Sequence, residues 1–185
     1  MPIIKQYLKE KYHLSNYQIA QIEFFFKSII SELSKMIIMG ILFHKHLKMY
    51  FFLLFMMCLL RSFSGGIHFY TYHSCLMCSF AYMWIVMYLL PNITIPKYAK
   101  LFLLLLCAIT CYSIGPVLSK YRTNFPKKRL YYCRNITCLI ILIYTFIMYI
   151  VPKNPYLVLG FWMIILHSLQ LFVAKIRTKG ETVRW

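Results

Sequence analysis

The sequence has almost no acidic residues. Among its 185 residues there is no aspartate, and the only acidic side chains are Glu10, Glu23, Glu32 and Glu181. This scarcity excludes the paired aspartates of intramembrane aspartyl proteolysis, and it leaves no cluster of carboxylates for Mg²⁺ or Ca²⁺. The patterns H-E-x-x-H and G-x-S-x-G and a phosphate-binding glycine loop are also absent, so the common zinc-protease, serine-hydrolase and nucleotide-binding motifs are excluded.

The usual signs of a secreted, disulfide-bonded protein are missing as well. The N-terminal sequence MPIIKQYLKEKYHLSNYQIAQIE has no apolar core followed by small residues, so we expect no cleavable signal peptide. The seven cysteines are odd in number and lie mostly inside apolar runs, so we expect no disulfide framework. The first membrane span would then serve as its own signal.

Apolar residues, in contrast, are abundant. Hydrophobic residues make up 61% of the chain and aromatic residues 18%, and the mean hydropathy is +0.65. These values exceed those of ordinary soluble domains. The formal net charge is +17, but the basic residues flank apolar runs and form no stripe on a polar face, so we do not expect nucleic acid as a partner. The composition predicts one integral membrane domain over residues 1–185, with the lipid bilayer as its surroundings.

The pattern of apolar runs predicts an all-α fold, a polytopic helical membrane protein of about six spans. A second interpretation of the pattern is four strong spans plus weaker or interfacial helices. Residues 1–28 form an amphipathic N-terminal segment suited to the membrane surface. The six expected spans cover residues 29–43, 49–60, 75–90, 101–118, 136–151 and 156–174.

Three details refine this prediction. The run 29–43 is a weak span because it contains Glu32 and Lys35, which are spaced to pair with each other at i and i+3. The Gly115-Pro116 pair should bend or stop the fourth run, and residues 152–155 should form a tight turn between the last two.

The distribution of Lys and Arg predicts the topology. If both termini are cytoplasmic, fourteen basic residues lie inside and five lie outside, which agrees with the positive-inside rule. This orientation places the segment 61–75 and a basic loop, residues 119–134, at the cytoplasmic face. If the run 29–43 only lies in the interface, the orientation of everything after it inverts unless another segment compensates.

One segment, residues 61–75, combines glycines, hydroxyls, histidines and a cysteine: RSFSGGIHFYTYHSC. The pair Gly65-Gly66 breaks the helix and permits a close backbone approach. A cysteine nucleophile acts as its thiolate, which a nearby imidazole, a cation and a helix N-terminus favour. His68 and Arg61 precede Cys75, and Ser74 is expected to cap the helix that starts there.

Contact between His68 and Cys75 requires a bent segment. Residues seven apart on one straight helix are separated by about 10.5 Å along its axis, so the chain must turn back between them. A third group often orients the imidazole in such sites, but without aspartate we expect a simple dyad. The remaining candidates for a third group are Ser62, Ser64, Thr71, a backbone carbonyl and Glu32.

Two other interpretations of this segment remain open. In the first, the chain is a membrane binding or transport protein with a His/Cys metal site, because imidazole and thiolate are ligands of Zn²⁺ and Cu⁺. The irregular spacing of the four candidate ligands matches no recognised finger pattern. In the second, the chain is a scaffold whose cysteines only pack. The candidate ligands are His68, His73, Cys75 and Cys78.

The frame Arg61, Gly65-Gly66, His68 and Cys75, followed by an apolar span, resembles the signature of the accessory gene regulator protein B family. The chain length, the charged N-terminal segment and the basic loop after the fourth run also resemble that family. Its members are membrane peptidases that process quorum-sensing pro-peptides in Gram-positive bacteria. The resemblance implies Cys75 as the nucleophile and His68 as its partner. Arg61, Ser64, Gly65, Gly66 and Thr71 are the expected substrate-binding or supporting residues.

The resemblance also implies a mechanism. Cys75 would attack a carbonyl near the C-terminus of a short amphipathic pro-peptide and form a thioester, which a thiol or hydroxyl of the peptide would then displace to close a thiolactone or lactone. No cofactor and no metal are expected. The basic loop, residues 119–134, would attract an acidic C-terminal part of the pro-peptide. The resemblance is compatible with a homodimer, and it implies the cell membrane as the location.

Overall fold

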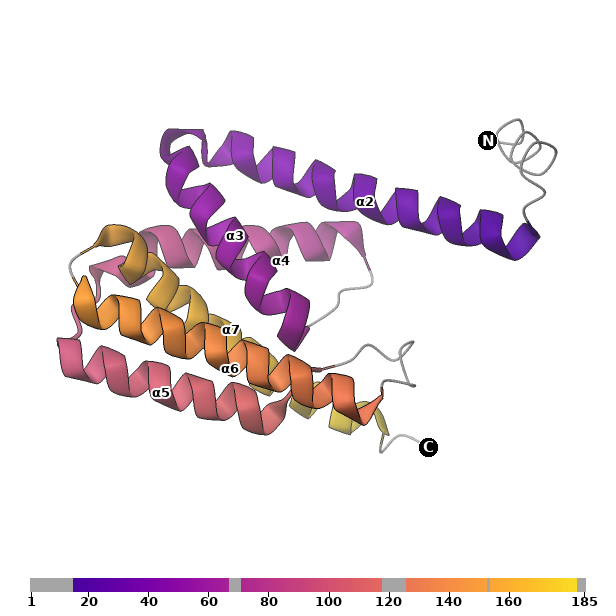
Figure 1. Cartoon of the computed structure of the whole chain (residues 1–185). Coiled ribbons are helices and arrows are strands. Elements are labelled where there is room, and N and C mark those ends of the chain that lie inside the picture. Colours follow the sequence, from indigo (N-terminus) through magenta and orange to yellow (C-terminus); the bar gives the residue numbers. More distant parts are fainter. Residues whose placement is uncertain (1–14, 67–70, 118–125, 153, 183–185) are drawn as a thin grey trace. The chain divides into compact units, whose positions relative to one another are not determined.

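The computed structural model describes residues 15–66, 71–117, 126–152 and 154–182, and every regular element within these ranges is a helix (Figure 1). The predicted all-α class is therefore confirmed. The chain divides into two compact units, residues 1–45 and residues 46–185. Each unit is described by itself below, and the single domain over residues 1–185 stays a prediction.

The first unit contains one long helix, α2 (Asn16–Leu42). Its N-terminus has a capping box, in which the Ser15 hydroxyl accepts from the Gln18 amide at 3.2 Å and the Gln18 side chain accepts from the Ser15 amide at 2.9 Å. α2 includes the second half of the predicted amphipathic segment and nearly all of the predicted weak span, 29–43. Residues 1–14 of the amphipathic segment lie outside the described residues.

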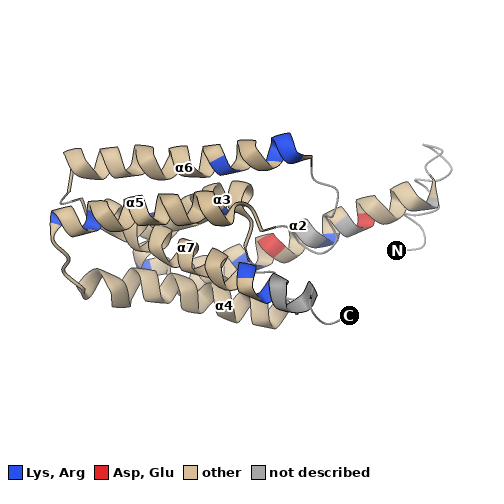
Figure 2. Ribbon diagram, turned by 90° about the horizontal axis from the view of Figure 1, so that it is seen from below, with Lys and Arg blue, Asp and Glu red and all other residues tan. Residues whose placement is uncertain are grey.

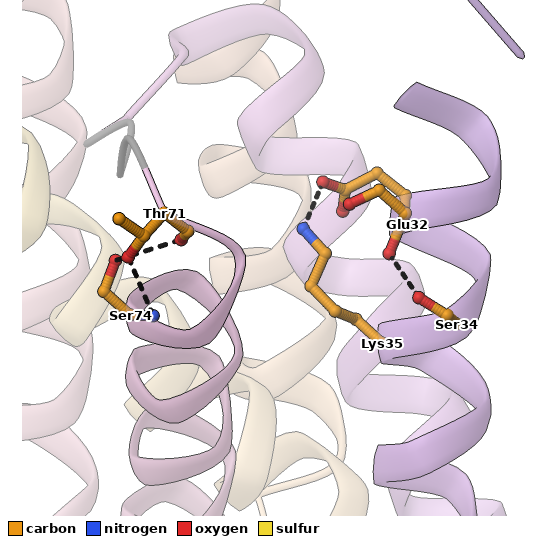
Figure 3. Close-up of polar contacts among 6 residues, drawn as sticks. Glu32, Ser34, Lys35, Thr71 and Ser74 are labelled. Atoms are coloured by element: carbon orange, nitrogen blue, oxygen red, sulfur yellow. Dashed lines mark hydrogen bonds and ion pairs between the residues drawn. The ribbon is translucent and has the colours of Figure 1, made fainter. Parts of the chain in front are cut away.

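Charged residues along α2 form pairs within the helix. Lys27 pairs with Glu23 at 3.1 Å, and Lys35 pairs with Glu32, so the predicted pairing of Glu32 and Lys35 is confirmed (Figure 3). α2 is not one of the described helices that are long and apolar enough to cross a membrane.

The second unit provides the candidate spans. Within the described residues, five helices are long and apolar enough to cross a membrane, which confirms a polytopic protein. The predicted sixth span is the weak one inside α2. The five spans are formed by η1 and α3 (His44–His46, Leu47–Ser64), by α4 with η2 and η3 (Tyr72–Trp84, Ile85–Leu89, Leu90–Asn92), by α5 (Lys97–Ile114), by α6 (Lys127–Ile150) and by α7 (Pro155–Thr182).

α7 is the central helix of this unit. It packs against α3, against α5 and against the η2–η3 end of the α4 span, while α5 also packs along α6 (Figure 1). Of its span, 56% is buried, against 17–33% for the other four. Phe161, Met163 and Leu171 of α7 are fully buried, whereas Phe102, Ile109 and Phe146 on the outer helices are exposed. The outer helices therefore present apolar faces that suit contact with lipid.

The helix ends follow the predicted breakers, with one exception. α5 stops at Gly115, whose φ of 68° ends the helix, and α7 starts at Pro155 after the predicted turn, where Asn154 accepts from the Tyr156 amide at 2.9 Å. The prediction of a loop over residues 119–134 was wrong in its second half, because α6 already begins at Lys127. Residues 118–125 lie outside the described residues.

Basic residues gather near the helix ends of the second unit, with long uncharged stretches between them (Figure 2). At the end where α3 stops and α6 starts, the chain carries many of them. The opposite end carries Lys48, Lys97 and Lys100. This distribution fits helices that cross an apolar layer and keep their charges at its two surfaces. The basic residues at the first end are Arg61, Lys127, Lys128, Arg129, Arg134, Lys175 and Arg177.

Candidate functional site

The upstream side of the predicted catalytic segment is a tight turn at the end of α3. Gly65 has a φ of 74° and its amide donates to the Arg61 carbonyl at 3.0 Å, which ends the helix. The Ser64 carbonyl accepts from the Val117 amide at 3.0 Å, and Gly65 forms a parallel β-bridge with Val117. A Cβ on Gly65 would lie less than 3.0 Å from the Val117 carbonyl oxygen. Only glycine fits this position, so the predicted helix break and close approach are confirmed.

Ser64 connects this turn to α7. Its hydroxyl donates to the Leu60 carbonyl at 2.7 Å and lies 2.6 Å from Nε2 of His167. Ser64 is 3% exposed and His167 is 2% exposed. His167 was missed in the sequence, although a histidine inside an apolar span is itself a signal, because buried polar groups in membrane helices need a partner.

Gly66 is buried between two polar side chains. A Cβ at this position would lie 3.6 Å from Nε of Arg61 and 3.6 Å from Nε2 of Gln170, which is ordinary contact. Arg61 lies in the last turn of α3, where a cation is favourable. Arg61 and Gln170 of α7 therefore both border Gly66.

The downstream side of the segment is the start of α4. Thr71 is the N-cap, and its side chain accepts from the Ser74 amide at 3.3 Å, while the Ser74 hydroxyl donates to the Thr71 carbonyl at 3.0 Å (Figure 3). The prediction of Ser74 as the cap was therefore wrong by one helical turn. The Cys75 amide donates to the Thr71 carbonyl at 3.1 Å, so Cys75 belongs to the first turn of α4, as predicted.

Cys75 and its neighbours are accessible. Cys75 is half-buried, and Cys78, three residues further along the same helix, is exposed. Phe63 and Tyr72 on the two sides of the segment are half-buried. The start of α4 therefore carries a partly accessible cysteine three residues after the half-buried Tyr72.

The structure describes all but one of the predicted site residues. Arg61, Ser64, Gly65 and Gly66 come together at the end of α3, and Thr71 and Cys75 come together at the start of α4. His68 lies outside the described residues, so the His68 to Cys75 dyad stays a prediction. The other side-chain candidates for a third group, Ser62 and Glu32, are engaged elsewhere: the Ser62 hydroxyl donates to the Cys58 carbonyl at 2.7 Å, and Glu32 pairs with Lys35 on α2.

The candidate metal ligands can be followed in part. His73 is exposed, and its ring stacks edge-on against Tyr72 at 5.7 Å between centroids. Among the residues that the structure describes, no three His, Cys, Asp or Glu side chains form a group that could hold a metal ion. The metal alternative also involves His68, which is outside that part of the chain.

Comparison with known proteins identifies the family. The family model described as accessory gene regulator B matches residues 3–172. A protein of Clostridium beijerinckii named as AgrB-like is 35% identical over 102 residues, which cover 52% of this chain and 51% of that protein, so the match spans about half the length of the curated relative. No solved structure matches the chain. Since the family model covers most of the sequence, including the whole segment 61–75, the chain belongs to the accessory gene regulator B family.

Proposed function

We propose that this chain is a membrane cysteine endopeptidase that cleaves a short amphipathic quorum-sensing pro-peptide and supports its cyclisation. The observation that carries the proposal is the position of Cys75, a half-buried thiol in the first turn of α4. It follows a turn that Gly65 fixes at the end of α3. The family match over residues 3–172 supports the same activity.

The proposed reaction has two steps. Cys75 Sγ attacks a carbonyl near the C-terminus of the pro-peptide, and His68 takes the thiol proton and gives it to the leaving amine, so that the peptide C–N bond breaks and a thioester forms. A thiol or hydroxyl of the peptide then attacks the thioester, closes a thiolactone or lactone ring and releases Cys75 as a thiol. Because the thioester keeps the acyl group activated, ring closure needs no nucleotide.

Cyclisation also requires that water does not hydrolyse the thioester first. Phe63 and Tyr72 belong to the segment 61–75 and are half-buried, so their rings are suited to restrict water near Cys75. The turn at Gly65 and Gly66 packs against Val117 and Gln170 and closes the upstream side. These contacts favour attack on the thioester by a group of the bound peptide over hydrolysis by water.

The proposed orientation places the site at the cytoplasmic face of the cell membrane. The end of the second unit that carries the Gly65 turn also carries most of its described Lys and Arg residues (Figure 2), and the positive-inside rule favours that end as cytoplasmic. Lys127, Lys128 and Arg129 are exposed at the start of α6. They would attract an acidic C-terminal part of the pro-peptide.

The test is co-expression with a short amphipathic candidate pro-peptide, followed by mass spectrometry of the peptide and of the enzyme. Wild type should release the C-terminal fragment and carry an acyl adduct on Cys75, and Cys75→Ser should abolish the release. Cys78→Ser is the matched control, because it removes another thiol three residues further along α4 and should remain active. All proteins are first shown to be inserted in the membrane.

Two results would contradict the proposal. Cleavage that persists in Cys75→Ser would exclude Cys75 as the nucleophile. Equal losses in Cys75→Ser, Cys78→Ser and His73→Ala, together with loss on adding a chelator, would favour the metal-binding alternative.

A further inference from the structure

A buried polar contact joins α3 to α7 beside the proposed catalytic segment. Ser64 on α3 and His167 on α7 are both more than nine-tenths buried, and their side chains meet at 2.6 Å. The proposed reaction uses neither side chain directly. A polar pair in an apolar interior is costly unless both members are hydrogen-bonded, so we asked what this pair holds in place.

The direction of the hydrogen bond follows from counting protons. The Ser64 hydroxyl has one hydrogen, which it donates to the Leu60 carbonyl at 2.7 Å. Ser64 Oγ can then only accept from His167, so the imidazole carries its hydrogen on Nε2 and donates it. His167 is therefore the donor in a chain of two bonds, from α7 to Ser64 and from Ser64 to the backbone of α3.

The backbone of the same serine fixes the turn that follows. The Ser64 carbonyl accepts from the Val117 amide at 3.0 Å, and Gly65 forms the bridge to Val117. Gln170, three residues after His167 on α7, contacts the position of Gly66. α7 thus contributes side chains to two of the three residues at which the chain leaves α3.

His68 follows Gly66 by two residues. His68 itself lies outside the described residues, and Gly66 is the last described residue before it. A misplacement of a reacting group by about 1 Å can lower a rate by roughly 10²-fold. The end of α3 is therefore a place where a remote contact can control the chemistry.

We propose that His167 is a positioning residue of this enzyme: by donating to Ser64, it fixes the end of α3 and the Gly65–Gly66 turn, from which the chain continues into the proposed catalytic segment. This inference rests on the proposed peptidase function. It assigns to His167 no contact with the substrate and no part in proton transfer.

The test compares two substitutions of similar length at one position. His167→Gln keeps an N–H donor that can reach Ser64, whereas His167→Met fills similar space without a donor. The measurement is the single-turnover rate of Cys75 acylation by the synthetic pro-peptide, followed by intact-protein mass, at several peptide concentrations. Thermal unfolding of each purified protein in detergent reports on folding.

We expect His167→Met to lower the maximal acylation rate at least tenfold, with the peptide concentration for half-maximal rate unchanged within twofold. His167→Gln should restore most of that rate. Ser64→Ala should lower the rate to a similar extent. The double variant Ser64→Ala/His167→Met should be no slower than the slower single variant, because both substitutions remove the same hydrogen bond. If His167→Met fails to insert, Ser64→Ala and His167→Gln carry the comparison.

The possible failures separate the two hypotheses. If wild type acylates and both His167 variants match it, the positioning role is wrong and the peptidase function stands. If His167→Met and His167→Gln lower the rate equally, in proportion to a loss of folding, His167 only packs and the inference is again wrong. The same holds if the effects of Ser64→Ala and His167→Met add. If wild type forms no acyl adduct, the proposed function fails, and this inference fails with it.

Discussion

The two sides of the segment 61–75 are held by different kinds of interaction. On the upstream side, Ser64 and Gly66 are buried, and the turn between them contacts residues of α7 and the Val117 backbone, all far away in sequence. On the downstream side, Thr71 and Ser74 are exposed and bond mainly to each other. The turn at Ser64, Gly65 and Gly66 is thus tied to the helix bundle, while the start of α4 with Cys75 is set by a local helix cap and stays accessible.

This difference suits a peptidase that receives a flexible substrate at a membrane surface. The upstream side is held by tertiary contacts, and the locally formed start of α4 carries Cys75, the proposed nucleophile, without covering it. Breaking a tertiary contact should disturb the unit as a whole, whereas breaking the cap should disturb only the first turn of α4. Three substitutions test this comparison, in decreasing order of expected effect.

The largest effect is expected for Gly65→Ala. An alanine would be strained at a φ of 74°, which costs about 1–3 kcal/mol, and its Cβ would overlap the Val117 carbonyl. The melting temperature in detergent should fall, and pro-peptide processing should be lost. An unchanged melting temperature would show that the bridge to Val117 does not hold the turn.

A smaller, local effect is expected for Thr71→Ala. Loss of an N-cap side chain costs about 1 kcal/mol, and it should act only on the start of α4. Hydrogen exchange at the amides of residues 72–75 should become faster, while the melting temperature stays near that of wild type. Thr71→Ser keeps the hydroxyl and is the matched control. A fall in melting temperature as large as that of Gly65→Ala would contradict the local nature of this side.

The smallest effect on stability is expected for Gly66→Ala. The position needs no positive φ, and the new Cβ would meet Arg61 and Gln170 at 3.6 Å, an ordinary contact. The free energy of unfolding should stay within about 0.5 kcal/mol of wild type, as measured by denaturation in detergent. Comparing Gly66→Ala with Gly65→Ala separates the effect of backbone strain from that of an added Cβ at the site. Equal destabilisation by the two substitutions would show that the adjacent glycines share one structural role.

Much of the fold could be predicted because hydropathy and helix breakers are local signals. Pro155 and Gly115 mark a helix start and a helix end where they were expected. The start of α6 at Lys127 could not be found in this way, because hydropathy marks the part of a helix that lies in the membrane, and a helix continues into polar surroundings when its residues allow it. Thr71 and Ser74 are both good capping residues, so composition alone did not choose between them.

By itself, the sequence determined that the chain is a helical membrane protein, since apolar runs depend only on local composition, and it predicted reactive residues in the segment 61–75. Only the tertiary structure decided what holds that segment. Ser64 and His167 are 103 positions apart, and Gly65 meets Val117 although the spans of α4 and α5 lie between them in the sequence. No periodicity or motif encodes such pairs. The first forms when packing of α3 against α7 brings buried polar groups together and each must find a partner, and the second forms when the chain after α5 returns to the end of α3.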